Sequence, residues 1–142
     1  KQFMEMRGAD GGPWRRLCAL PAFWVGLLYD QTALDAAWDL VKGMDAQTRD
    51  DLRIAASVDG LQAEAGGVKM MDLARQAVAI SHAGLTARGR SGVGGLVPDE
   101  SHFLNALQDS LETGQTPADE LLARYHGDWQ GDLTRIYADY SY

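Results

Sequence analysis

The chain has few of the features that mark several common classes of protein. Its 142 residues contain one cysteine, Cys18, so no disulfide can form within the chain and a small scaffold built on several disulfides is excluded. No apolar run approaches the roughly 18 residues that a membrane-spanning helix needs. The stretch from Leu17 to Leu28 is apolar but too short, so we expect a buried helix there and no membrane partner.

Basic residues are also scarce. Lys and Arg number 13 against 20 Asp and Glu, which gives a net charge of −7. This charge opposes binding to a polyphosphate, and we expect no nucleic-acid partner. The three histidines, His82, His102 and His126, show no i, i+4 pair and no nearby cysteine, so a zinc site is not expected.

An acid and a base stand two residues apart near the start of the chain. Glu5 and Arg7 lie in a segment that we interpret as a β-strand, which a Gly- and Pro-rich loop from Asp10 to Pro13 ends. Alternate residues of a strand point to the same face, so a carboxylate and a guanidinium would lie side by side. A carboxylate suits Mg²⁺ and a guanidinium suits phosphate oxygens, although an exposed ion pair is the commoner meaning of such a pattern.

The surrounding residues are more specific. The segment from Glu5 to Asp30 resembles the plant-type glutamate–cysteine ligases, the form shared by plants and many proteobacteria. Further matches cover the rest of the chain: Gly60-Leu61, Thr116 to Leu122, Tyr125 to Trp129 and Tyr140 to Tyr142. The resemblance implies a relative of glutamine synthetase that uses ATP and Mg²⁺ to join the γ-carboxylate of glutamate to the amine of cysteine through γ-glutamyl phosphate.

The resemblance also implies roles for individual residues. Glu5 is expected to be a metal ligand, and Arg7 is expected to be catalytic, contacting the phosphate that is transferred. Arg15 and Arg16 belong to the same motif and are candidate contacts of the ATP phosphates. Cys18 is most simply a buried apolar residue, but in the resembling plant enzymes a cysteine at this place pairs with one in the N-terminal part as a redox switch.

The resembling ligases are several times longer than this chain. We therefore expect residues 1–142 to be the C-terminal part of a single catalytic domain, with residues 1–13 forming the active-site strand and loop, residues 14–142 a helical body, and the N-terminal part absent. The expected fold class is a mostly α fragment, about six or seven helices after one N-terminal strand, of an α+β glutamine synthetase-like domain. Alone it should be inactive.

The expected partners are the small molecules glutamate and cysteine and the remainder of the same catalytic domain. The sequence leaves open whether the protein is a monomer or a homodimer. The glycine-rich segment from Arg88 to Gly95 looks more like that of the bacterial ligases, so we expect a cytoplasmic protein of a proteobacterium. The alternative function is a stand-alone helical protein-interaction module without catalysis, in which the Glu-x-Arg strand has no chemical role.

Helical periodicity and capping residues predict the boundaries of the helical body. Pro21 is expected to stand in the first turn of the first helix, with Asp30 or Thr32 capping the second. Residues 60–67 are expected to form a loop. The remaining helices are expected over Asp45 to Ser57, Val68 to Arg88, Glu100 to Thr113, Pro117 to about Gly127, and Asp132 to Tyr140.

Overall fold

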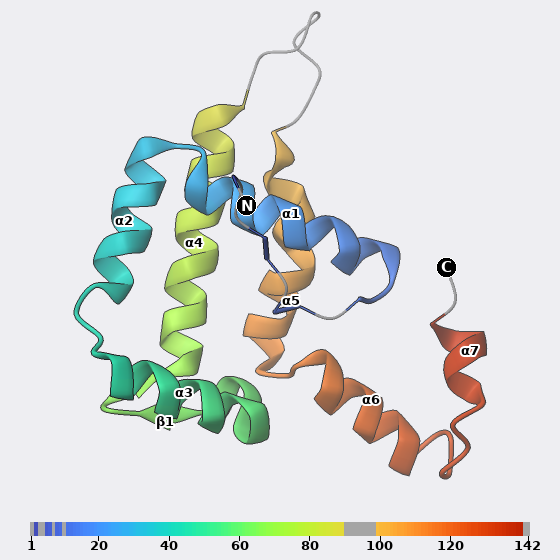
Figure 1. Cartoon of the computed structure of the whole chain (residues 1–142). Coiled ribbons are helices and arrows are strands. Elements are labelled where there is room, and N and C mark those ends of the chain that lie inside the picture. The colour runs from blue at the N-terminus through green and yellow to red at the C-terminus, as the bar shows by residue number, and fades with distance from the viewer. Residues whose placement is uncertain (1, 3–4, 7, 10, 90–98, 141–142) are drawn as a thin grey trace, which may run out of the picture.

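The structure is a computed structural model that describes residues 2, 5–6, 8–9, 11–89 and 99–140. Within these residues it contains seven α-helices, two short 3₁₀ helices and one two-stranded sheet, so the expected mostly α fold class is confirmed (Figure 1). The α-helices are α1 (Trp14–Leu28), α2 (Gln31–Val41), α3 (Ala46–Asp59), α4 (Met70–Arg88), α5 (Asn105–Thr113), α6 (Pro117–His126) and α7 (Arg135–Asp139). The shorter elements are η1 (Gly60–Gln62), β1 (Glu64–Ala65), β2 (Val68–Lys69) and η2 (Glu100–Leu104).

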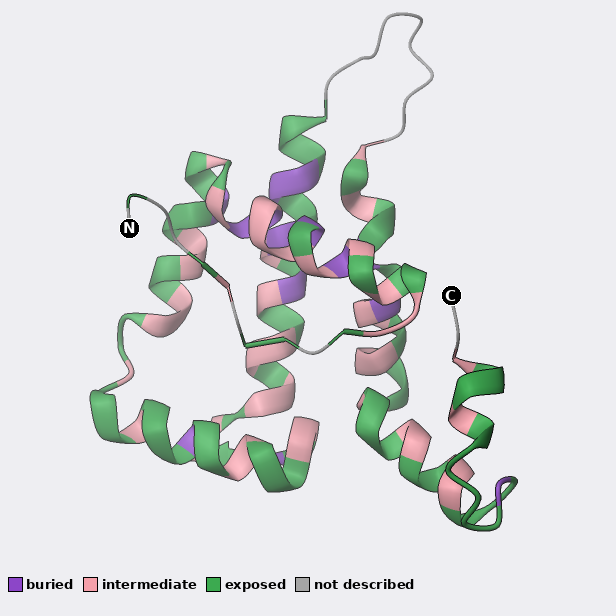
Figure 2. Cartoon of the chain, turned by 45° about the vertical axis from the view of Figure 1, so that its right-hand side comes forward, coloured by how far each residue is buried: buried purple, intermediate pink, exposed green. Residues whose placement is uncertain are grey.

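Helix α4 stands at the centre of the molecule. Helix α1 crosses it, α2 and α5 lie on either side, and α3 with the β1–β2 hairpin lies at its N-terminal end (Figure 1). Buried residues gather where α1 meets α4 and η2 (Figure 2), and a core cluster there consists of Ala22, Leu85 and Leu104. The packing of α1 on α4 therefore organises the body.

Two glycines allow that packing to be close. A Cβ atom added to Gly26 of α1 would overlap the backbone carbonyl and hydroxyl of Ser81 on α4, and one added to Gly84 would overlap the backbone carbonyl of Gly26. Ser81 is completely buried, and its hydroxyl donates a hydrogen bond to the Phe23 carbonyl at 2.9 Å. The contact is thus backbone against backbone, with its buried polar group satisfied.

Helix α1 begins earlier than the sequence predicted. We expected Pro21 in its first turn, whereas α1 starts at Trp14 and contains Pro21 in its interior, where a proline removes one helical hydrogen bond. The expectation was wrong because the preference of proline for the first turn of a helix is weaker than the stabilisation gained by burying the residues before Pro21. Ala19, which precedes the proline, is only 1% exposed, so the first two turns are held by tertiary packing.

The segment from residue 60 to residue 67, expected to be a loop, contains η1 and the turn of a hairpin. Strand β1 pairs with β2 in antiparallel register, Glu64 opposite Lys69 and Ala65 opposite Val68. Gly66 and Gly67 connect the strands with φ angles of 56° and 77°. Positive φ at both central positions is what a tight hairpin turn requires, so the Gly-Gly pair was a signal that our prediction missed.

The N-terminal strand is the other difference. Residues 5, 6, 8 and 9, which the structure describes, have no regular secondary structure. The expected strand is therefore not present in these four residues, because a β-strand needs ladder hydrogen bonds to a neighbouring strand. Most of the expected Arg88 to Gly95 loop, residues 90–95, lies outside the described residues.

Most predicted helix ends are confirmed. Asp30 caps α2 by accepting a hydrogen bond from Ala33 N at 3.0 Å, and Asp45 caps α3 through Thr48 N at 2.7 Å. Thr116 and Asp119 form a reciprocal capping box at the start of α6. Gly114 ends α5 in the left-handed conformation, with φ 68°. Short-range hydrogen bonding is therefore readable from the sequence.

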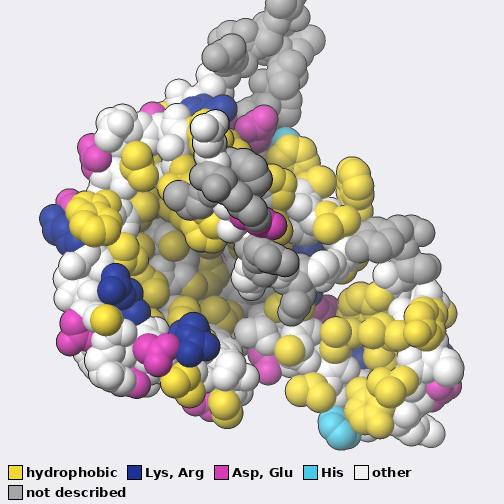
Figure 3. All heavy atoms as spheres, viewed as in Figure 1, with side chains coloured by type: hydrophobic (Ala, Val, Ile, Leu, Met, Phe, Trp, Pro, Cys, Tyr) yellow, Lys and Arg dark blue, Asp and Glu magenta, His cyan; other side chains and the backbone are white. Residues whose placement is uncertain are grey.

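Helices α6 and α7 form an arm that projects from the body (Figure 1). Trp129 is buried inside the arm, where its indole Nε1 donates to the Asp139 carboxylate at 2.9 Å. Hydrophobic side chains gather on the visible face of the arm (Figure 3), and Leu122, Leu133 and Tyr137 are 55%, 63% and 79% exposed. Neither helix of the arm contains a buried residue.

None of the helices in the described part of the chain is, taken singly, long and apolar enough to cross a membrane. Helices α1 and α2 meet the length and composition criteria only as a pair, and they are bent by 93° at their junction.

We predict that Gly26→Ala destabilises the body. The new methyl group would meet the Ser81 backbone, which cannot move without displacing α4, so the free energy of unfolding should fall by about 3 kcal/mol. Urea unfolding followed by circular dichroism measures this change. Gly43→Ala is the matched control, because a Cβ at Gly43 would have no described atom beyond its chain neighbours within 4 Å. Equal stability of the two variants would contradict the close approach.

Acid should weaken the α3 cap. The backbone hydrogen bond from Thr48 is the main cause that lowers the pKa of Asp45 below its usual 3.8. A lowered pKa in the folded state gives stability that is present above pH 3.8 and is lost as the pH falls through the folded value. Asp45→Asn keeps a capping oxygen without titrating. The melting temperature of the wild type should exceed that of Asp45→Asn at neutral pH and approach it in acid; a gap independent of pH would contradict the account.

Candidate functional site

The expected site residues that the structure describes lie before α1 and in its first half. Glu5, the predicted metal ligand, is exposed, and Arg7 lies outside the described residues. Arg15, Arg16 and Cys18 are on the first turns of α1. The structure thus brings three of the five expected site residues onto one helix.

Arg15 lies at the edge of a hollow between α1, η2 and α5. Its guanidinium forms an ion pair with Asp109 at 3.1 Å, with both side chains more than half exposed. The hollow, of about 300 Å³, is lined by Trp14, Arg15, Cys18, His102, Phe103, Asn105, Ala106 and Asp109. Because water screens an exposed pair, Asp109 holds Arg15 weakly, and the guanidinium remains able to turn to another anion.

Arg16 is held differently. Its Nη2 lies 2.7 Å from Glu120 Oε2 on α6, and the side chains are only 18% and 34% exposed. Arg16 Nε is buried, with no hydrogen-bond acceptor among the described residues. Arg15 and Arg16 are neighbours in the sequence but contact different helices, and their expected contacts with ATP phosphates stay predictions.

Cys18 is partly buried and is a free thiol. It shares the 300 Å³ hollow with Arg15 and with the rings of His102 and Phe103, whose centroids are 4.1 Å apart and whose planes are tilted by 38°. The expectation of a simply buried apolar residue is therefore too narrow, because the thiol borders a surface hollow. The sequence could not show this, since η2 and α5 come more than 80 residues after Cys18.

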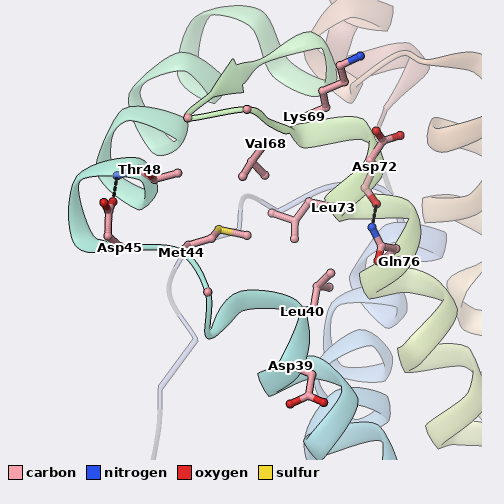
Figure 4. A pocket seen from close by; sticks show the side chains of 13 residues that line it. Asp39, Leu40, Met44, Asp45, Thr48, Val68, Lys69, Asp72, Leu73 and Gln76 are labelled. Atoms are coloured by element: carbon pink, nitrogen blue, oxygen red, sulfur yellow. Dashed lines mark hydrogen bonds between the residues drawn. The ribbon is translucent and has the colours of Figure 1, made fainter.

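A second hollow, of about 430 Å³, lies between the α2–α3 turn, the hairpin and α4 (Figure 4). Its apolar side chains include Leu40, Met44, Val68 and Leu73, and Asp39, Asp45, Lys69 and Asp72 stand around them. The Asp45 carboxylate is already bonded to Thr48 N. Sequence reasoning missed this hollow because the hairpin that closes one side was not expected.

Among the residues that the structure describes, the acids, the histidines and Cys18 do not form a metal centre. In the part of the chain that the structure describes, no group of three or more His, Cys, Asp or Glu side chains is arranged to hold a metal ion. The carboxylate of Glu5 is a suitable oxygen donor for Mg²⁺, which is often held by one or two carboxylates together with substrate phosphates. Its role as a metal ligand stays a prediction.

Comparison with protein-family models gives a match to the glutamate-cysteine ligase family 2 (GCS2) over residues 1–139. The chain therefore belongs to this family, and the resemblance found in the motif from Glu5 to Asp30 is confirmed.

Curated relatives agree with the family match. The chain is 42% identical to a chloroplastic glutamate–cysteine ligase of Solanum lycopersicum, 41% to that of Arabidopsis thaliana and 40% to that of Medicago truncatula. Each alignment covers the whole chain but only 26% of the relative. The chain thus spans about a quarter of the length of these relatives.

These relatives correct the expected location and source. We expected a cytoplasmic, proteobacterial protein, whereas the relatives are named as chloroplastic enzymes of plants, so the expectation is wrong. It rested on the glycine-rich segment from Arg88 to Gly95. The length and composition of a connecting segment vary among relatives far more than helices do, which makes such a segment a poor guide to source.

Proposed function

We propose that the protein containing this chain ligates the γ-carboxylate of L-glutamate to the amine of L-cysteine, with ATP and Mg²⁺, as the first step of glutathione biosynthesis. The observation that carries the proposal is the match to glutamate–cysteine ligases along the full length of the chain, at 40–42% identity to three plant relatives. The substrates are small molecules, and no nucleic acid takes part.

The reaction has two steps. A γ-carboxylate oxygen of glutamate attacks the γ-phosphorus of ATP, which releases ADP and forms γ-glutamyl phosphate. The amine nitrogen of cysteine then attacks the acyl carbon, the C–O bond to phosphate breaks, and the nitrogen loses a proton. Negative charge accumulates on the transferred phosphoryl group in the first step, so catalysis consists largely of positioning and charge neutralisation.

Within this chain, Glu5 and Arg7 are the residues proposed to act on that group. The Glu5 carboxylate is proposed to bind Mg²⁺, which neutralises phosphate charge when bound. Arg7 is proposed to contact the transferred phosphoryl oxygens, to which its planar guanidinium can donate two parallel hydrogen bonds. Arg15, with its exposed and weakly held guanidinium, is a further candidate phosphate contact.

The rest of the catalytic domain is proposed to supply the other ligands. The chain spans about a quarter of the length of its relatives, so most of the residues of a complete ligase lie outside it. We therefore propose that the 142-residue chain alone does not turn over and that the remaining chain provides the sheet beside Glu5. A homodimer is compatible with this arrangement.

A stand-alone interaction module is the second candidate. The exposed apolar side chains of the α6–α7 arm, among them Leu122 and Tyr137, favour it. ADP release by the protein extended to the length of its relatives separates the two, with Mg-ATP and glutamate present and cysteine added or omitted. Cysteine-dependent release supports the ligase, and its absence supports the module.

In the extended protein we predict that Arg7→Ala lowers kcat for ligation by about a thousandfold, because one donor to the developing phosphoryl charge is lost. The circular dichroism spectrum and melting temperature should not change. Arg53→Ala is the control, since Arg53 is exposed on α3 and pairs only with Asp50 of the same helix among the described residues. Normal turnover of Arg7→Ala would remove Arg7 from the mechanism.

Cys18 is proposed to pair, on oxidation, with a cysteine outside this chain. Its thiol borders a surface hollow, so a partner sulfur can reach it. Thiol titration of the denatured extended protein, after reducing and after oxidising treatment, should show a loss of two thiols that Cys18→Ser abolishes. An unchanged thiol count in the wild type would end this proposal.

A further inference from the structure

Arg16 contacts two parts of the chain that are far apart in sequence. Its backbone N–H donates to the Pro13 carbonyl at 2.8 Å, which begins α1. Its aliphatic stem lies beside Gly12, because a Cβ at Gly12 would be 3.5 Å from Arg16 Cβ and 3.6 Å from Arg16 Cδ. Its guanidinium reaches Glu120 at 2.7 Å. One side chain therefore joins the loop after the Glu5–Arg7 motif to helix α6.

The first turn of α6 holds the acid in place. The capping box of Thr116 and Asp119 fixes this turn, and Glu120 is the next residue. Thr116 also lies against Gly60, since a Cβ added to Gly60 would be 2.9 Å from the Thr116 methyl carbon. Glu120 is thus presented by a turn that is fixed by its own hydrogen bonds and anchored to η1.

The Arg16–Glu120 ion pair is less exposed to water than the Arg15–Asp109 ion pair, and we expect it to be the stronger of the two. Its side chains are 18% and 34% exposed, against 54% and 62% for the Arg15–Asp109 pair. Less water screens the charges, and removal of either partner leaves the other charge partly desolvated. The buried Arg16 Nε cannot be reached by an outside phosphate unless the side chain leaves its present position.

We propose that Arg16 is a positioning residue, which, through Glu120, fixes the Gly11–Pro13 loop and so the approach of the Glu5–Arg7 motif to the substrates, and that it is not a nucleotide contact. The proposal rests on the proposed ligase function for its catalytic consequence. It assigns the α6–α7 arm a task in the reaction, namely to hold the start of α1 by one ion pair.

A double-mutant cycle in the extended protein tests the proposal, with Arg16→Gln, Glu120→Gln and the double variant. Hydrogen–deuterium exchange of the peptide that contains Gly11 and Gly12 is the first measurement. Each single variant should speed exchange, and the double variant should add nothing to either, because one interaction is lost in all three. The charge exchange Arg16→Glu with Glu120→Arg should restore protection relative to its two single variants.

Kinetics provide the second measurement. All three glutamine variants should lower kcat by a common factor of about tenfold and should change the KM for Mg-ATP to the same extent as one another, because the motif is displaced equally in each. Asp50→Asn is the matched control, as it removes one acid from the exposed Arg53–Asp50 pair on α3. It should change neither exchange near Gly12 nor kcat.

Two results would overturn the proposal. One is a KM for Mg-ATP that rises about tenfold or more in Arg16→Gln while Glu120→Gln behaves as wild type, which is the signature of a direct phosphate contact. The other is exchange near Gly12 that does not respond to either variant. A wild-type protein without ligase turnover would refute the proposed function, and the exchange cycle would still decide the role of the ion pair.

Discussion

The close packing of α1 on α4 is the constraint on which the rest of the structure depends. Gly26 and Gly84 let the two backbones touch, and the buried Ser81 hydroxyl bonds to the Phe23 carbonyl within that contact. A side chain at either glycine would separate the helices and open the core around Leu85. Because α1 also carries Arg15, Arg16 and Cys18, the same contact places every described site residue except Glu5.

The start of α1 is held from two directions. Burial of Ala19 in the core holds its second turn, and the Arg16–Glu120 ion pair ties its first turn to the arm. The described part of the Glu5 segment has no regular secondary structure and leads through the Gly11–Pro13 loop into α1.

Sequence reasoning succeeded where the determining contacts are local. Caps such as Asp45 and Thr116 bond to backbone groups within three residues, and those helix starts were predicted. Sequence reasoning failed where contacts with residues distant in the sequence determine the structure. Pro21 lies inside α1 because of packing, and the partners of Arg15 and Arg16 are 94 and 104 residues away. The family, which depends on the order of residues alone, was predicted correctly, whereas roles at Glu5 and Arg7 stay predictions.

Activation of a carboxylate by phosphoryl transfer is the central chemical step proposed for the complete protein. Isotope transfer tests this step most directly: the extended protein is given Mg-ATP, cysteine and glutamate labelled with ¹⁸O in its γ-carboxylate, and the released phosphate is analysed by mass spectrometry. We expect one ¹⁸O atom in each phosphate formed, because the carboxylate oxygen bonded to phosphorus leaves with it. Phosphate free of the label, released together with γ-glutamylcysteine, would contradict this mechanism.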